Sequence, residues 1–171
     1  MVSFTFLTLP VLVLLAIVQL SAAMSAGSAK NILRVHNKYR AKHQAPPLRW
    51  NTTLAKYAQK WSNRCEFKHS MGDYGENLAY GYPNWGSVVS AWYSEVKDYD
   101  YSNPGFSGKT GHFTQLVWKS TTEIGCGVKT CANLNGAKLY TCSYLEFGNM
   151  VSDDNIYFIQ NVLPPKGNDR H

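Results

Sequence analysis

The first two thirds of the chain carry apolar residues every three to four positions, which is the spacing of amphipathic helices. Ile32, Val35 and Tyr39 form one such stripe, which ends before the helix-breaking Pro46. A later stripe begins just after Asn51, a residue type that favours the N-cap of a helix. The pattern predicts four helices, over residues 29–43, 51–65, 87–96 and 110–119.

The last third of the chain has the composition of strands. Residues 123–130 and 139–146 predict two strands joined through Asn135-Gly136, a strong hairpin turn signal. We expect strands to dominate residues 123–158. Helices followed by strands predict a layered α+β sandwich. Two segments rich in Gly, Ser, Tyr and Asn predict ordered loops, residues 70–84 and 99–111.

The amino-terminal segment is apolar from Phe4 to Leu20 and then rich in small residues. This composition predicts a signal peptide cleaved after Ala23, or as late as Ala29, and therefore a secreted, extracellular protein. The alternative is a retained membrane anchor, although the run is shorter than the ~20 residues that span a bilayer. We expect one domain over residues 30–165, followed by a short tail over residues 166–171.

Basic residues are unevenly distributed. The formal net charge is +6, and residues 30–68 hold ten Lys and Arg side chains but only one acidic residue, Glu66. Such a basic surface suits a polyanionic cell wall or an anionic membrane surface, or is simply solvated. Export from the cell excludes nucleic acid as a partner.

The four cysteines predict two disulfides in an oxidising compartment. A hairpin centred on Leu134 places Cys126 opposite Cys142. Cys126 and Cys131 would lie roughly 16 Å apart along an extended strand, too far for a bond unless the strand bends sharply. Cys65 is then the remaining partner for Cys131. A zinc site made of the four thiols lacks any Cys-x-x-Cys pair.

Four blocks of sequence resemble the cysteine-rich secretory, antigen five and pathogenesis-related (CAP) superfamily. The most specific is GHFTQLVWKST at residues 111–121, and the others are HNKYRAKHQAPPLRW at 36–50, GENLAYG at 75–81 and LYTCSYLEFGN at 139–149. The resemblance implies a three-layer α-β-α sandwich with a mainly antiparallel sheet. It also implies the pairs Cys65–Cys131 and Cys126–Cys142. Glu146 departs from the family pattern, and the three bridges of plant members are reduced to two.

The same resemblance implies a cleft shared by His69, Glu76, Glu95 and His112. Two imidazoles with nearby carboxylates suit Zn²⁺, or another divalent cation such as Mg²⁺, held by the histidines while the glutamates orient the rings or a bound water. The alternative is a structural polar network. If the protein is an enzyme, Glu76 or Glu95 is the expected general base of a metal-dependent hydrolase or protease. The chain has no Gly-x-Ser-x-Gly and no His-Glu-x-x-His motif, so we expect a binding protein rather than an enzyme.

Residues 99–108 resemble the aromatic loop through which fungal members bind sterols. The alternative is an ordinary surface turn with its aromatic rings folded into the core. Some relatives instead hold a fatty acid between helices, here the first and third. The loop residues expected to contact a lipid are Tyr99, Tyr101, Asn103, Pro104, Gly105 and Phe106.

Asn51-Thr52-Thr53 is a glycosylation sequon, and a glycan at Asn51 would compete with its role as an N-cap. The sequence as a whole leads to a secreted carrier of sterols or other small hydrophobic lipids. The alternatives are a defence or effector protein that binds a cell wall or receptor through its basic helices, and the metal-dependent hydrolase.

Overall fold

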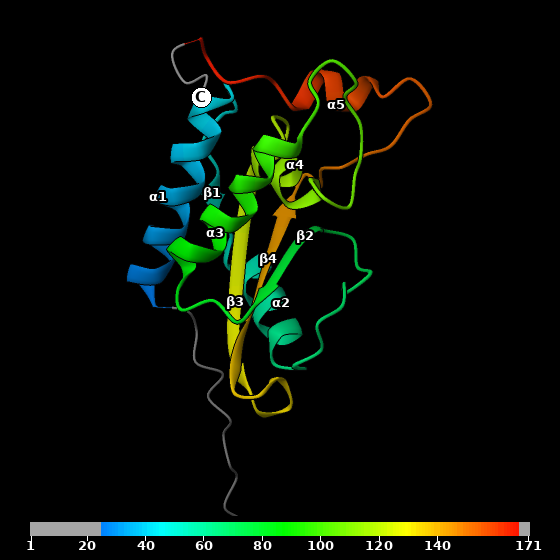
Figure 1. Ribbon diagram of the computed structural model, residues 1–171. Helices are drawn as coiled ribbons and strands as arrows, with labels where there is room; N and C mark the ends of the chain where they lie inside the picture. Colours follow the sequence, from blue (N-terminus) through cyan, green and yellow to red (C-terminus); the bar gives the residue numbers. More distant parts are fainter. Residues whose placement is uncertain (1–24, 168–171) are drawn as a thin grey trace, which may run out of the picture.

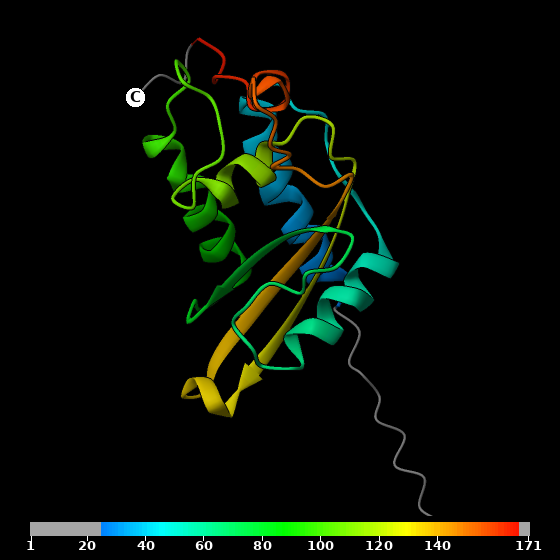
Figure 2. The same ribbon diagram turned by 90° about the vertical axis from the view of Figure 1, so that its right-hand side faces the viewer.

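The computed structural model describes residues 25–167, which form three layers (Figure 1). The middle layer is a four-stranded sheet in the order β1-β3-β4-β2. Helix α2 covers one face, and α1, α3 and α4 cover the other (Figure 2). The expected α-β-α sandwich is confirmed. The expected signal peptide over residues 1–23 lies outside the described residues, and no helix within residues 25–167 is long and apolar enough to cross a bilayer.

Asparagine and serine side chains set the starts of the first three helices. Ser25 accepts from the amide of Ser28 at the start of α1, and Asn84 accepts from Ser87 at the start of α3. Because Ser25 is the cap, α1 begins three residues earlier than predicted. The α-helices are α1 (Ala26–Lys42), α2 (Thr52–Ser62), α3 (Trp85–Ser94), α4 (Gly111–Val117) and α5 (Ile156–Asn161).

The predicted hairpin is present with the predicted register. Its strands are β3 (Glu123–Cys131) and β4 (Ala137–Leu145), with Cys126 directly opposite Cys142. A short 3₁₀ turn over Ala132–Leu134 precedes Asn135 and Gly136, which have φ of 54° and 76°. These left-handed conformations favour Asn and Gly.

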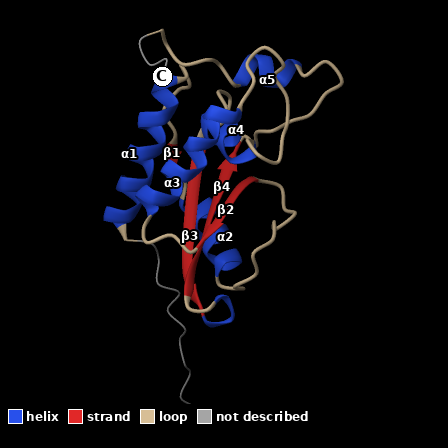
Figure 3. Ribbon diagram, viewed as in Figure 1, coloured by secondary structure: helices blue, strands red, loops and turns tan. Residues whose placement is uncertain are grey.

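Three elements differ from the prediction (Figure 3). Strand β2 (Gly75–Tyr80) lies inside the predicted loop over residues 70–84, where it pairs with β4 along the sheet edge. The two-residue strand β1 (Arg49–Trp50) pairs in parallel with β3. Helix α5 replaces strand near residue 158, because a short apolar run suits either element and its packing decides.

The two disulfides join Cys65 to Cys131 and Cys126 to Cys142, as expected. The first ties the end of the α2 segment to the hairpin, and the second crosslinks β3 to β4. Gly125 and Gly127 let α2 lie directly on β3, since a Cβ atom at either position would meet the α2 backbone.

Arg40 of α1 is a buried side chain that connects α1 to the segments before β1 and after α4. Its side chain is fully buried, and its guanidinium donates to the carbonyl oxygens of Pro46, Leu116, Trp118 and Thr121 at 2.8 to 3.0 Å. These carbonyls include ones at the end of α4 that have no partner within the helix. Arg40 therefore fixes the position of α4 relative to α1. It also fixes the candidate site residue His112, which lies at the start of α4.

Candidate functional site

His69 and Glu76 form one hydrogen-bonded pair. Glu76 is the second residue of β2, and His69 lies in the segment between α2 and β2. Nδ1 of His69 is 2.8 Å from Oε1 of Glu76, which also accepts from the amide of Ser70 at 2.9 Å. The Glu76 side chain is 6% exposed and that of His69 58%. The hydrogen bond to Glu76 raises the pKa of His69, and partial burial opposes this shift.

His112 and Glu95 form the second pair, which lies between the end of α3 and the start of α4. Nδ1 of His112 is 2.7 Å from Oε1 of Glu95, at the end of α3. The second oxygen of Glu95 accepts from the amides of His112 and Phe113 at the start of α4, both at 3.0 Å. The His112 ring stacks on Trp92 of α3 at 6.0 Å. Glu95 therefore orients the ring and holds the start of α4 together.

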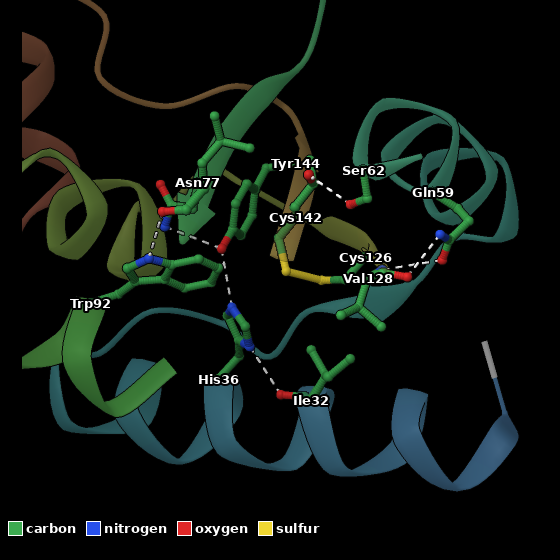
Figure 4. Close-up of a disulfide and its surroundings, with 12 residues drawn as sticks. Ile32, His36, Gln59, Ser62, Asn77, Trp92, Cys126, Val128, Cys142 and Tyr144 are labelled. Atoms are coloured by element: carbon green, nitrogen blue, oxygen red, sulfur yellow. Dashed lines mark hydrogen bonds between the residues drawn. A yellow bond between two sulfur atoms is a disulfide. The ribbon is translucent and has the colours of Figure 1, made fainter. Parts of the chain in front are cut away.

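Asn77 brings the two pairs to the same edge strand. It follows Glu76 in β2, and its Nδ2 donates to the His112 carbonyl oxygen at 3.0 Å and to the Tyr144 hydroxyl at 3.3 Å. Tyr144 in turn contacts His36 of α1 at 3.1 Å. Figure 4 shows Asn77, Tyr144 and His36 in one chain of hydrogen bonds across the α1 face of the sheet. Both pairs are thus tied to β2, which the sequence pattern alone did not predict.

Within residues 25–167 the four side chains form two separate His–Glu pairs and not a cluster of four ligands. A carboxylate can only accept, so Nδ1 of each ring carries the proton and Nε2 keeps its lone pair. Neither Nε2 has a hydrogen-bond partner among residues 25–167. However, no three or more His, Cys, Asp or Glu side chains in this range are placed to hold one ion together. The two carboxylates thus orient the rings, one of the two roles expected for them.

The loop over residues 99–108 bounds a surface cavity of about 490 Å³. This volume lies within the ~300–1,000 Å³ typical of small-molecule sites. Val151 and Asn155, from the segment before α5, complete its wall. Sequence reasoning missed these two residues, because nothing in their local pattern shows that the segment folds back onto the loop. The lining from the loop and its flanks is Asp98, Tyr99, Asp100, Asn103, Pro104, Gly105, Phe106, Ser107 and Thr110.

The three aromatic side chains of the loop differ in their surroundings. Tyr99 is 7% exposed and packs edge to face on Phe113, and Tyr101 packs on Tyr99. Phe106 is 56% exposed. Two of the rings therefore belong partly to the core, as in the surface-turn alternative, and Phe106 alone of the three offers a largely free face.

Tyr99 lines this cavity, and its hydroxyl oxygen is itself buried. Its hydroxyl makes no hydrogen bond in the described part of the chain, although the Gly105 amide is close enough to affect it. Burial raises the pKa of the Tyr99 phenol. The hydroxyl is therefore neutral at physiological pH and able to donate or accept.

The first and third helices pack closely near their carboxyl ends. Tyr39 of α1 stacks on Tyr93 of α3 with ring centroids 3.9 Å apart, and its hydroxyl lies 2.9 Å from Oγ of Ser90. These contacts join the two helices directly through their side chains.

The sequon residue Asn51 uses both ends of its amide. Oδ1 accepts from the amides of Thr53 and Leu54 as the α2 cap, and Nδ2 donates to Glu123 at 2.6 Å. A glycan attaches to Nδ2. It would therefore compete with the bond to Glu123, and the cap through Oδ1 would remain available.

The α-β-α sandwich and the two disulfides are those implied by the resemblance of the sequence blocks. The family model "CAP: Cysteine-rich secretory protein family" matches residues 33–144, and the chain belongs to this family.

Curated relatives agree. The chain is 47% identical over 139 residues to Protein PRY2 of Saccharomyces cerevisiae and 43% over 147 residues to Secreted protein RBT4 of Candida albicans. These alignments cover 78% and 81% of the chain but only 40% and 41% of the relatives, so the chain spans less than half their length. It is 40% identical over 145 residues to the human Golgi-associated plant pathogenesis-related protein 1, covering 79% of the chain and 92% of that protein.

Solved structures show the same fold. The venom allergen-like protein 4 of Schistosoma mansoni has a TM-score of 0.59 at 27% identity, with 86% of this chain and 94% of that one covered. A crystal structure of NaASP2 with Zn²⁺ has a TM-score of 0.67 at 22% identity, covering 84% and 88%.

Proposed function

We propose that this CAP protein is secreted and carries sterols, or closely related neutral hydrophobic lipids, in the cavity bounded by residues 99–108. The cavity of about 490 Å³ under an exposed Phe106 is the observation that supports this most directly. The resemblance of the loop to the sterol-binding loop of fungal members supports the same ligand class.

The charges at the cavity favour a neutral lipid over a fatty acid. Asp98 and Asp100 line it, and no Lys or Arg does. Hydrogen bonds from the hydroxyl and amide of Ser102 lower the pKa of Asp100, so this carboxylate stays charged near neutral pH. A fatty-acid carboxylate would be repelled. A sterol hydroxyl would instead find the unpaired hydroxyl of Tyr99.

The first experiment measures binding of fluorescent or radiolabelled cholesterol to the purified protein. We expect saturable binding at micromolar concentration, and at least tenfold weaker binding for Phe106→Ala, because the loop loses its free apolar face. Phe67→Ala is the matched control, since Phe67 is 51% exposed but lies outside the cavity; its affinity should stay within twofold. No saturable binding of either sterols or fatty acids would refute the proposal.

The second experiment tests the polar contact. Tyr99→Phe should weaken cholesterol binding about three- to tenfold, the effect of one lost hydrogen bond. The same substitution should leave binding of cholesteryl acetate, whose hydroxyl is blocked, unchanged. Equal effects on both ligands would show that Tyr99 acts only through packing.

A metal site at His69 and His112 is a second proposal, supported by the two Nε2 atoms without partners. Zn²⁺ suits imidazole ligands better than Mg²⁺, which prefers oxygen. Bound there, zinc would supply positive charge to polarise a water or carbonyl. Metal analysis after dialysis against Zn²⁺ should show one equivalent for the wild type and none for His69→Ala/His112→Ala.

The hydrolase alternative requires a free carboxylate. Both Glu95 oxygens accept from the ring or amides around His112, and only Oε2 of Glu76 has no partner among the described residues. Glu76 is therefore the better candidate for a general base. Hydrolysis that survives in His69→Ala/His112→Ala would refute this alternative.

A further inference from the structure

A second surface cavity, of about 390 Å³, lies near the opposite end of α3 from the loop cavity. It is lined by residues from the start of α1, from the start of α3 and from strands β3 and β4, whose ribbons are shown in Figure 1. Its lining is rich in hydroxyl and amide groups over an aromatic base: Ser28, Asn31, Pro83, Asn84, Trp85, Val128, Thr130, Lys138 and Tyr140.

The three chain segments that line this cavity carry no acidic residue. Residues 26–65, 77–94 and 124–145 contain neither Asp nor Glu. The same three segments supply all of its walls. With only basic charges nearby, the cavity has a positive potential that favours an anionic ligand.

One cation lines the cavity, and a second is hydrogen-bonded to a lining residue. Asn31 lines it, and the guanidinium of Arg34 donates to Oδ1 of Asn31 at 2.8 Å. Across the opening, Lys138 lines the cavity and its ammonium group donates to the Pro83 carbonyl oxygen at 3.3 Å. Neither cation forms an ion pair with an acidic side chain among residues 25–167.

Basic side chains continue away from the cavity along α1. Lys30, Arg34 and Lys38 are exposed and four residues apart, so they lie on one side of the helix at intervals of about 6 Å. A polymer with regularly spaced negative charges could place one of its units in the cavity and contact Lys30, Arg34 and Lys38 with the following units.

We propose that this cavity and the α1 row bind an acidic polysaccharide, with a sulfated, phosphorylated or carboxylated sugar unit in the cavity. Sugar hydroxyls match the amide and hydroxyl groups of the lining, and the anionic groups match Arg34, Lys138 and the row. A bilayer fits less well, because α1 has no exposed large apolar side chain to enter the interface. This site is independent of the proposed lipid cavity.

The test measures binding of dextran sulfate, with uncharged dextran of the same length as reference. The wild type should bind dextran sulfate and not dextran. Arg34→Gln/Lys138→Gln should weaken binding at least tenfold and reduce its salt dependence, because fewer counterions are released.

Lys56→Gln/Lys60→Gln is the matched control, since it removes the same charge from the exposed face of α2, on the opposite side of the sheet. Its affinity for dextran sulfate should change by no more than about twofold. Equal losses in both double variants would overturn the proposal, because net charge alone would then explain binding. Thermal unfolding of each variant confirms that it is folded.

Two further probes test whether the site instead binds an anionic membrane or an acidic protein. Vesicles containing phosphatidylserine and a poly-glutamate peptide should bind more weakly than dextran sulfate at equal ionic strength. Tighter binding of either probe, lost in Arg34→Gln/Lys138→Gln, would replace the polysaccharide with a membrane or an acidic protein.

Discussion

His36 is fully buried between α1 and the sheet. Its Nδ1 donates to the Ile32 carbonyl oxygen at 2.9 Å, so its Nε2 must accept the proton of the Tyr144 hydroxyl. Burial is the largest cause that lowers the pKa of His36 to about 4; the hydrogen bond to Ile32 opposes the shift, and the nearby charge of Arg40 adds to it. The ring is therefore neutral in the folded protein at physiological pH.

The low pKa of His36 predicts a loss of stability in acid. Its pKa is about 4 when folded and about 6.5 when unfolded, so only the unfolded chain takes up the proton between these values. The contribution of His36 to the free energy of unfolding should therefore be constant above pH ~6.5. It should fall by about 3 kcal/mol as the pH is lowered to ~4. Urea unfolding at several pH values measures this.

The contribution of His36 is isolated by comparison with His36→Gln, which does not titrate. This variant should be less stable at pH 7 but lose about 3 kcal/mol less than the wild type toward pH 4. An NMR titration in which the His36 ring protonates near its ordinary pKa of 6.5 would contradict the prediction.

The sequence predicted which single residues belong to the candidate site, but not the contacts that each of them makes. The resemblance pointed to His69, Glu76, Glu95 and His112 as a group. It did not show that each glutamate binds Nδ1 of a different histidine, because the spacing of seven and seventeen residues carries no such geometry. Nor does any local signal mark Tyr99 as the residue with an unpaired buried hydroxyl.

At the scale of elements, what could be predicted depends on how local the determining contacts are. The helices and the hairpin arise from side-chain periodicity and a turn signal, which lie within each segment. Strand β2 depends on backbone pairing with β4, more than sixty residues later, and α5 on packing of Phe158 against Trp118. Such contacts leave little trace in a short window of sequence.

The contact of α2 with β3 leads to a prediction about Gly127. A Cβ atom there would meet the Gln59 and Ala58 backbone, which cannot move without displacing α2. Gly127→Ala should therefore lower the free energy of unfolding by about 1–3 kcal/mol, the usual cost of overpacking. Gly27→Ala is the control, because Gly27 lies in α1 with nothing near its missing Cβ atom, and it should be neutral or stabilising. Equal effects in chemical denaturation would mean that α2 adapts freely.

At the scale of the whole molecule, the two cavities differ in the charges of their walls. Asp98 and Asp100 line the loop cavity, whereas the three segments that line the second cavity contain Lys and Arg but no Asp or Glu. The cavities lie near opposite ends of α3: Asn84 and Trp85 at its start line one, and Asp98 and Tyr99, which follow its end, line the other. A protein held on an acidic polymer by its basic end would therefore leave the proposed lipid cavity open.

The two disulfides connect the layers over different lengths of chain, which leads to the last prediction. Cys65–Cys131 spans 66 residues and Cys126–Cys142 spans 16. By loop-closure entropy, replacing the longer bridge with alanines should cost about 4 kcal/mol and replacing the shorter one about 3 kcal/mol. Both can be measured by urea unfolding.

The bridges also differ in what they hold. Cys65 immediately precedes the segment that carries His69, so Cys65→Ala/Cys131→Ala should loosen the His69–Glu76 hydrogen bond. The raised pKa of His69 should then fall toward its ordinary value. Cys126→Ala/Cys142→Ala leaves that segment attached, and the pKa of His69 in an NMR titration should not move. If both variants shifted it equally, the His69–Glu76 pair would depend on the stability of the whole fold rather than on the anchor at Cys65.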